Sequence, residues 1–190
     1  MPVKTITDGT VSDAYLALLA DRGIDYFFGN AGTDFAPIIE SFAKAQALGT
    51  PAPKAMLVPH ENLAIHMALG YYAVTGKPQV VMVHVNVGTA NALNGIINAS
   101  RGNIPVLFSS GRTPYSEVGD REGRRTREVH WPQEMFDQGA LAREMVKWDY
   151  ELKDKAVLET VVDRALNIAM TEPRGPIYLT LPREPLAESF

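Results

Sequence analysis

The stretch Val80-Val81-Met82-Val83-His84-Val85 contains the strongest strand signal in this chain, because β-branched and apolar residues run through it almost without interruption. A segment with helical character follows from Gly88 to about Ser100, and Pro105-Val106-Leu107-Phe108 predicts the next strand. Continuous apolar strands are typical of a parallel sheet, in which both faces are covered. Strand, helix and strand in this order indicate a parallel α/β unit.

The same alternation extends from this unit toward both ends of the chain. Helices are expected at 10–22, 34–48, 61–75 and 154–170, and further strands at 26–28, 55–58, 144–148 and 176–181. We therefore predict an α/β domain, a three-layer parallel sheet with helices on both faces. Between Gly111 and Asp137 the sequence is polar and unpatterned, so we expect a long loop that is mobile or ordered by a partner.

Composition excludes several classes of protein. Of the 190 residues, 46% are hydrophobic and 21% charged, which is enough for one sizeable core. The absence of Cys excludes disulfides, thiolate metal sites and a cysteine nucleophile. With 18 basic and 22 acidic residues, the chain has no basic stripe for nucleic acid. It also has neither a signal peptide nor the roughly 18 apolar residues that span a bilayer, so we expect a cytoplasmic protein without membrane contact.

Glu61 is the first candidate for chemistry, because it follows a predicted buried strand and begins a predicted helix. Ala64, Ile65 and Ala68 share its helical face, so we expect the carboxylate to point toward packed surface. Burial of this kind raises the pKa of a carboxylate and lets it share a proton with a heterocyclic nitrogen. The alternative is that Glu61 only complements the helix dipole, and the pattern alone leaves both interpretations open.

Two glycine-bearing loops follow predicted strands, Gly29-Asn30-Ala31-Gly32-Thr33 and Asn86-Val87-Gly88-Thr89-Ala90-Asn91. Loops between a strand's carboxyl end and a helix are where open α/β sheets bind ligands. Neither loop has the three-glycine spacing of a dinucleotide fingerprint or the Lys-Ser/Thr ending of a P-loop, which argues against a nucleotide-binding domain. Each loop alone is compatible with a tight turn, but together with Glu61 they predict a ligand site at one sheet edge.

In their order and spacing, these segments resemble the N-terminal pyrimidine-binding domain of thiamine-diphosphate enzymes of the acetolactate synthase and benzoylformate decarboxylase group. The segments that carry the resemblance are 23–32, 60–64 (His-Glu-Asn-Leu-Ala), 68–71, 75–77, 88–91, 94–96, 146–150 and 174–179. The chain departs from the family at Ala31, where Pro is usual. It also lacks Ser-Gly-Pro-Gly at 86–91 and has Ser110-Gly111-Arg112 where synthases have Gly-Gln. These departures argue against a true acetolactate synthase and leave the cofactor class intact.

The resemblance implies a role for each candidate residue. Glu61 would hydrogen-bond N1′ of the cofactor's aminopyrimidine, so that the 4′-imino group removes the C2 proton of the thiazolium. His84 is placed like a proton-transferring histidine of benzoylformate decarboxylase, and the alternative is a neutral histidine hydrogen-bonded at a strand end. Substrate contacts would come from Thr33 and His84, with a small 2-keto acid as substrate. Further cofactor contacts are expected from Asn30, Ala31, Gly32, Gly88 and Asn91.

The resemblance also implies that this chain holds only the pyrimidine half of thiamine diphosphate. The family binds the diphosphate and Mg²⁺ through Gly-Asp-Gly and Asn-Asn on a separate domain, and neither motif occurs here. We therefore expect a pyrimidine-binding domain at 1–185 and the start of a linker at 186–190, with no metal site and without the central and diphosphate-binding domains. The expected partners are a diphosphate-binding domain of the same or another subunit and further copies in a homo-oligomer.

By itself such a chain would be inactive, as a fragment of a longer enzyme or as one subunit of a split enzyme. A non-catalytic interaction module with the same fold is the alternative from another functional class. Glu61 argues against that alternative, because a module with no thiamine to activate needs no inward carboxylate.

Overall fold

The computed structural model describes residues 8–190, so residues 1–7 of the expected domain lie outside the described part. Its centre is a six-stranded sheet with the strand order β2-β1-β3-β4-β6-β5, in which every neighbouring pair is parallel. The strands are β1 (Tyr26–Asn30), β2 (Lys54–Leu57), β3 (Val80–Val83), β4 (Leu107–Arg112), β5 (Asp149–Glu151) and β6 (Ile177–Pro182). The predicted α/β fold class is confirmed.

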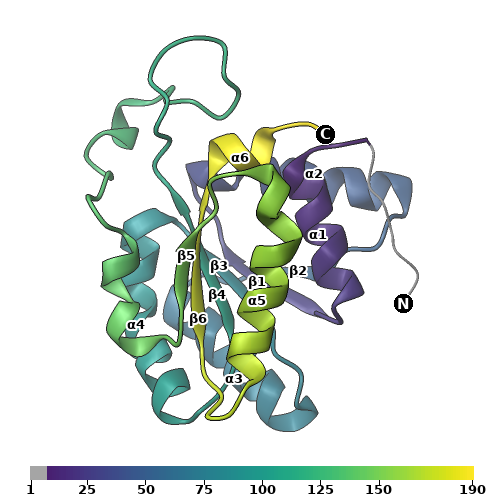
Figure 1. Cartoon of the computed structure of the whole chain (residues 1–190), viewed down its shortest axis with the longest axis vertical. Coiled ribbons are helices and arrows are strands. Elements are labelled where there is room, and N and C mark those ends of the chain that lie inside the picture. The colour runs from purple at the N-terminus through teal and green to yellow at the C-terminus, as the bar shows by residue number, and fades with distance from the viewer. Residues whose placement is uncertain (1–7) are drawn as a thin grey trace.

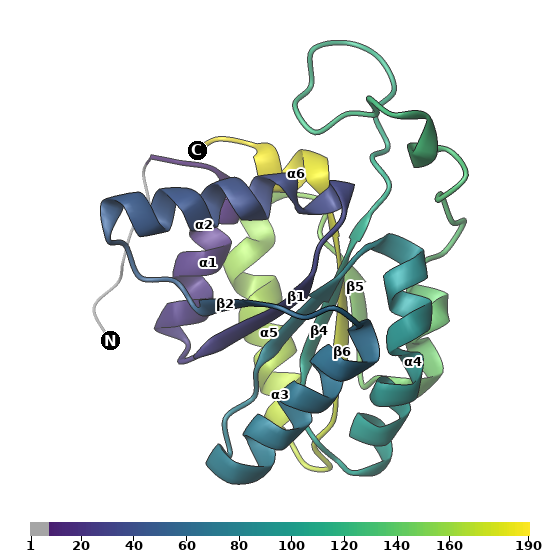
Figure 2. The ribbon, with the colours of Figure 1, turned by 180° about the vertical axis from the view of Figure 1, so that it is seen from behind.

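Helices cover both faces of the sheet (Figures 1 and 2). They are α1 (Val11–Asp21), α2 (Ala36–Leu48), α3 (Glu61–Thr75), α4 (Val85–Arg101), α5 (Leu158–Met170) and the short α6 (Arg183–Ala187). Helices α1, α2, α5 and α6 pack on one face, whereas α3 and α4 pack on the other. No helix in the described part of the chain is long and apolar enough to cross a membrane.

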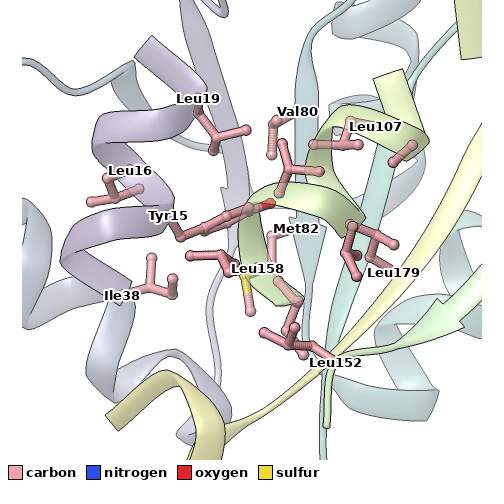
Figure 3. Close-up of a cluster of buried hydrophobic side chains, with 14 of the residues drawn as sticks. Tyr15, Leu16, Leu19, Ile38, Val80, Met82, Leu107, Leu152, Leu158 and Leu179 are labelled. Carbon is pink, nitrogen blue, oxygen red and sulfur yellow. The ribbon is translucent and has the colours of Figure 1, made fainter. Parts of the chain in front are cut away.

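Each face has its own hydrophobic core, because successive strand residues point to opposite sides of a sheet. In β3, Val80 and Met82 join the cluster under α1 and α5, whereas Val81 and Val83 join the cluster under α3 and α4. Figure 3 shows the first of these clusters, in which Tyr15 of α1 lies among residues of several elements. All four residues of the central strand β3 are buried because helices cover both of its faces, which explains why the strongest strand signal in the sequence is continuous.

The junction of β3 and α4 differs from the sequence prediction. Strand β3 ends at Val83, so His84 lies at the N-cap of α4 and not inside the strand. Helix α4 begins at Val85, so the predicted loop at 86–91 is helical. The cause is a tertiary contact, since the backbone N–H of Val85 donates to the carboxylate of Asp34, 3.1 Å away, and this starts the helix early.

The prediction of a strand at 144–148 is wrong. This segment begins with a 3₁₀ turn at Arg143–Met145, and the strand lies further on, at Asp149–Glu151. Met145 and Val146 are apolar because they pack against the core under α3 and α4. The apolar residues at 145 and 146 therefore indicate burial and not a strand. The position of the edge strand β5 is set by its pairing with Tyr178–Thr180 of β6.

Polar anchors tie the long loop after β4 to the body of the molecule. The Glu184 carboxylate accepts hydrogen bonds from the backbone N–H groups of Tyr115 and Ser116, at 2.8 and 2.9 Å. The loop then rises beyond the ends of β4 and β6, as Figure 1 shows at the top of the molecule. At the C-terminus, where we expected a linker to start, Leu186 and Ala187 are buried in α6.

Candidate functional site

The sheet changes winding direction between β1 and β3, and this creates the place where the site forms. The chain leaves β1 toward β2 on one side and then returns across to β3 on the other. Open α/β sheets bind ligands in the crevice outside the carboxyl ends of the strands at such a switch point. The segments that follow β1, β2 and β3 therefore meet at this edge, and they carry Gly32, Glu61 and His84.

Glu61 is the first residue of α3, and 8% of its surface is exposed. The side chain of His60 caps the helix by accepting from the backbone N–H of Asn62. The Glu61 Oε2 atom accepts a hydrogen bond from Asn91 Nδ2 on α4 at 3.2 Å, and its Oε1 makes no hydrogen bond within the described residues. One carboxylate oxygen is thus fixed by α4, while the other is available to a ligand.

A close approach of α3 and α4 produces the contact between Glu61 and Asn91. A Cβ atom on Gly95 would lie 2.7 Å from the side chain of Ile65 and 2.9 Å from Oδ1 of Asn62. Only a glycine allows the helices to come this near without a shift. Because Asn91 lies one turn before Gly95, the close crossing brings its amide to the carboxylate of Glu61.

His84 forms a buried pair with Asp34, a residue that sequence analysis did not single out. The His84 Nδ1 and Asp34 Oδ1 atoms lie 2.6 Å apart, and the Asp34 side chain is 1% exposed. The hydrogen bond with the Asp34 carboxylate raises the pKa of His84, as do the negative charges of Asp34 and Glu61, whereas partial burial opposes the shift. The pair therefore favours a charged imidazole at the switch point.

Two glycines leave the space that this pair occupies. A Cβ on Gly32 would lie 2.1 Å from Nδ1 of His84, and a Cβ on Gly111 would lie 1.9 Å from Oδ2 of Asp34. The backbone is also strained here, since Val85 has a φ of +34°, a value that β-branched residues rarely adopt. The loop after β1, the start of α4 and the end of β4 are consequently fitted tightly around the pair.

The long loop reaches the same place with two glutamines. Gln133 Nε2 lies 3.1 Å from Nε2 of His84, on the side of the ring opposite Asp34. Gln138 Nε2 donates to Ser110 Oγ and to the carbonyl of Gly111, both at 2.8 Å. The loop predicted as mobile or partner-ordered is therefore held over the sheet edge by this chain's own side chains.

The remaining predicted site residues occupy different surroundings. Asn30 is the last residue of β1, and Ala31 and Thr33 are exposed beside it. Gly88 lies inside α4, where a Cβ would meet the Cβ of Val83 at 3.0 Å, so it faces the sheet. In the structure, Glu61 thus contacts Asn91, and Gly32 lies close to His84. Gly88 instead lies where α4 packs against β3.

Sequence reasoning missed Asp34 and Gln133. A signal for Asp34 was present, because it is an acidic residue directly after the first glycine-bearing loop, which we took only as the start of a helix. For Gln133 there was no signal, since it belongs to an unpatterned loop. Within residues 8–190, no three His, Asp or Glu side chains are grouped closely enough to hold a metal ion.

Comparison with known proteins gives a consistent result. The profile described as "Thiamine pyrophosphate enzyme, N-terminal TPP binding domain" matches residues 9–141. Benzoylformate decarboxylase of Pseudomonas aeruginosa is 26% identical over 179 residues, which cover 94% of this chain and 31% of that protein. The acetolactate synthase large subunit of Haemophilus influenzae is 27% identical over 172 residues, 90% of this chain and 27% of the relative.

A solved structure agrees with these relatives. The thiamine diphosphate-dependent 4-hydroxybenzoylformate decarboxylase of Rhodococcus jostii RHA1 superposes with a TM-score of 0.77 at 25% identity. The similarity covers 94% of this chain and 31% of that chain. This chain therefore spans less than a third of the length of each of these relatives.

Proposed function

The chain belongs to the thiamine pyrophosphate enzyme family through its N-terminal TPP binding domain, and from this we propose that it is the pyrimidine-binding part of a 2-keto acid decarboxylase or carboligase. The observation that carries the proposal is the carboxylate of Glu61, which is buried at the switch-point edge with one oxygen bound to Asn91. A non-catalytic module of the same fold would have no need of this inward carboxylate.

The residues at the edge fit a bound aminopyrimidine. The second oxygen of Glu61 is able to exchange a proton with a ring nitrogen, while Asn91 holds the first oxygen and fixes the orientation of the carboxylate. Thiamine diphosphate supplies the electron sink for decarboxylation of a 2-keto acid. The chain's part of the chemistry is to place and protonate the pyrimidine through Glu61.

His84 is the second residue to which we assign proton transfer. It follows β3 at the same edge as Glu61, and the hydrogen bond with Asp34 raises the pKa of its imidazole, so the ring takes up a proton more readily. Exposed Thr33 lies next to Gly32, at which an added Cβ would meet the His84 ring, and this nearness to His84 supports our assignment of Thr33 to the substrate. We assign cofactor contacts to the neighbouring residues Asn30, Ala31 and Gly32.

The diphosphate and its Mg²⁺ are assigned to a partner domain of the same or another subunit. Support comes from the described residues, which gather no metal-binding cluster, and from the sequence, which lacks Gly-Asp-Gly and Asn-Asn. We assign homo-oligomerisation to the surface near the carboxyl ends of the strands. Leu63 and Val87, in the first turns of α3 and α4, are 49% and 50% exposed there. A cytoplasmic location is proposed because the chain has no Cys.

The substitution Glu61→Gln tests this proposal in the enzyme that contains this chain. Gln is nearly isosteric but cannot exchange a proton with the pyrimidine, so we expect exchange of the cofactor's C2 proton and turnover to fall by about 10²-fold or more. Exchange is measured by quenched-flow labelling and followed by NMR.

Glu159→Gln is the control for the helix dipole, because Glu159 also lies in the first turn of a helix, α5, where it is exposed and pairs with Arg22. If Glu61 acted only on the helix dipole, both variants would lose a similar small amount of stability and neither would lose activity. Normal C2 exchange in the Glu61→Gln variant would refute the assignment.

A further inference from the structure

We propose that Asp34 is a positioning residue that fixes the imidazole tautomer of His84, so that Nε2 is the nitrogen that gains and loses the proton. This inference rests on the proposed function of His84 in proton transfer. Its basis is the geometry of the pair, in which Asp34 Oδ1 lies 2.6 Å from His84 Nδ1. A carboxylate can only accept a hydrogen bond, so in the neutral ring Nδ1 carries the hydrogen and Nε2 carries the lone pair.

The opposite side of the ring agrees with this tautomer. The amide Nε2 of Gln133 lies 3.1 Å from His84 Nε2 and donates to its lone pair. When Nε2 takes up a proton, it becomes a hydrogen-bond donor. The Gln133 side chain must then rotate so that its amide oxygen accepts, or move away so that a substrate takes its place. Gln133 therefore covers the reactive nitrogen, and Asp34 determines which nitrogen that is.

The two oxygens of Asp34 have separate tasks. Oδ1 binds the imidazole, while Oδ2 accepts from the backbone N–H of Val85 at 3.1 Å and caps α4. With 1% of its side chain exposed, Asp34 is fixed in place by the cap and by the absence of space around Gly111. This anchoring makes the carboxylate a rigid reference for the ring, which a flexible surface carboxylate could not be.

Charged groups from the neighbouring elements also act on His84. Asp34 and the more distant Glu61 raise the pKa of His84, and partial burial lowers it. Burial lowers the pKa of His130 in the long loop, and the positive charges of Arg183, Arg125 and then His84 lower it further. Asp34 makes the largest contribution to the pKa of His84, so its replacement should dominate any change in titration.

The sign of the pH effect follows from the raised pKa. The pair stabilises the folded chain fully below the ordinary imidazole pKa of about 6.5, and this contribution is lost as pH rises through the folded-state pKa. In Asp34→Asn the stabilisation should disappear, so the stability difference between wild type and variant should be largest at low pH and shrink as pH rises.

Asp34→Asn separates a positioning role from a capping role. An Asn oxygen still caps Val85, but its Nδ2 then faces His84 Nδ1 and donates to it, which moves the hydrogen of the neutral ring to Nε2. In the full 190-residue chain labelled with ¹⁵N-histidine, we expect wild-type His84 to be the Nδ1–H tautomer at high pH. In Asp34→Asn we expect the Nε2–H tautomer and a His84 pKa lowered by about one unit or more.

Asp13→Asn is the matched control. Asp13 is another carboxylate at a helix start, where it accepts from the backbone of Thr10 and pairs with Lys44, and its replacement should leave both His84 readouts unchanged. An Nε2–H tautomer in the wild-type chain would overturn the proposal without any variant. An unchanged tautomer and pKa in Asp34→Asn would do the same.

The kinetic readout distinguishes this inference from the proposed function. In the enzyme that contains this chain, Asp34→Asn should lower kcat and shift its pH profile, while C2 exchange, which depends on Glu61, continues. If Glu61→Gln leaves C2 exchange and turnover unchanged, the proposed function fails even though the tautomer result can stand. If C2 exchange depends on Glu61 but Asp34→Asn leaves the pH profile of kcat unmoved, only the role of Asp34 is refuted.

Discussion

At the scale of single residues, His84 is defined by what surrounds it. Sequence analysis left two interpretations, a proton-transfer residue or a neutral histidine bonded at a strand end. The 2.6 Å contact with buried Asp34 and the resulting rise in pKa favour an imidazole that takes up charge readily. Such a pair would also stabilise the fold around a purely structural histidine at low pH, so kinetics must separate the two interpretations.

Substitution of His84 by Ala should therefore affect chemistry at a specific step. We expect turnover of the enzyme that contains this chain to fall by roughly 10²-fold or more, the usual scale for loss of a positioned proton donor. Exchange of the C2 proton of thiamine diphosphate should continue, because it depends on Glu61. Steady-state kinetics and C2 exchange, measured on the same preparation, check both statements.

His66→Ala is a suitable control for this variant. His66 is exposed on α3, where its ring bonds the carbonyl of Asn62 and the amide of Asn98. Its loss should leave turnover within about twofold of wild type, as for a surface substitution outside the site. Unchanged turnover in His84→Ala would make His84 a packing residue, and loss of C2 exchange would place it at a different step.

Residues of the site were predictable to the extent that local sequence carries their signal. Glu61 and His84 stand at junctions between apolar strands and helices, and such junctions are visible in the pattern. Asp34 and Gln133 matter through contacts with a residue far away in sequence. No local pattern encodes such a contact, so the acidic residue after the first glycine-bearing loop was visible in the sequence, but its pairing with His84 became identifiable only in three dimensions.

At the scale of elements, the crossing of α3 and α4 determines the geometry around Glu61. The two helices form most of the core on their face of the sheet, where Ala64, Ile65 and Ala68 are completely buried. The small residues at the crossing hold the helix axes close. Any increase in their separation would lengthen the hydrogen bond from Asn91 to Glu61.

We predict that Gly95→Ala destabilises the fold, although alanine favours helices. The helix propensity gain is about 1 kcal/mol. The new methyl would lie 2.7 Å from the branched Cβ of Ile65, a rigid part of the side chain, and overpacking of this kind costs about 1–3 kcal/mol. Because Asn62 Oδ1 is also too near, we expect a net loss of stability, up to about 2 kcal/mol, in urea unfolding.

Gly70→Ala provides the comparison within α3 itself. Gly70 is an exposed helical glycine with nothing within 4 Å of an added Cβ, so alanine should stabilise the chain by about 0.5–1 kcal/mol. The two variants should thus shift the urea midpoint in opposite directions. Equal stability of Gly95→Ala and Gly70→Ala would mean that the crossing relaxes without cost.

Elements were predicted well where burial and hydrogen bonding coincide. Helix α3 has the predicted bounds, and β1, β4 and β6 lie within a few residues of theirs. The prediction failed at β5, where apolar Met145 and Val146 pack without pairing, and at the start of α4, where Asp34 supplies the cap. In both places the deciding partner belongs to another part of the chain.

At the scale of the whole molecule, the strand order explains why the site residues meet. A parallel sheet with helices on both faces was predictable from apolar strands alternating with helices. The order β2-β1-β3-β4-β6-β5 was not, because the sequence pattern does not specify which strands are neighbours. The reversal between β1 and β3 brings Asp34 and His84 together at the carboxyl ends of the strands.

This architecture leads to a prediction about cofactor binding by the 190-residue chain alone. We expect thiamine diphosphate to bind weakly or not at all, even with Mg²⁺ present. The edge offers Glu61 and a few neighbours to the pyrimidine, whereas the described residues gather no metal-binding cluster for the diphosphate. A chain with a formal net charge of −4 also provides no general attraction for an anionic ligand.

Isothermal titration calorimetry with thiamine diphosphate and Mg²⁺ checks this expectation, and thiamine without the diphosphate is the matched ligand. If only the pyrimidine is recognised, both ligands should bind with similarly low affinity, because the diphosphate adds no contact. Addition of a diphosphate-binding domain should then create the difference between them. A sub-micromolar Kd for the chain alone, about −8 kcal/mol or better, would mean that these residues hold the whole cofactor and that the division between domains is wrong.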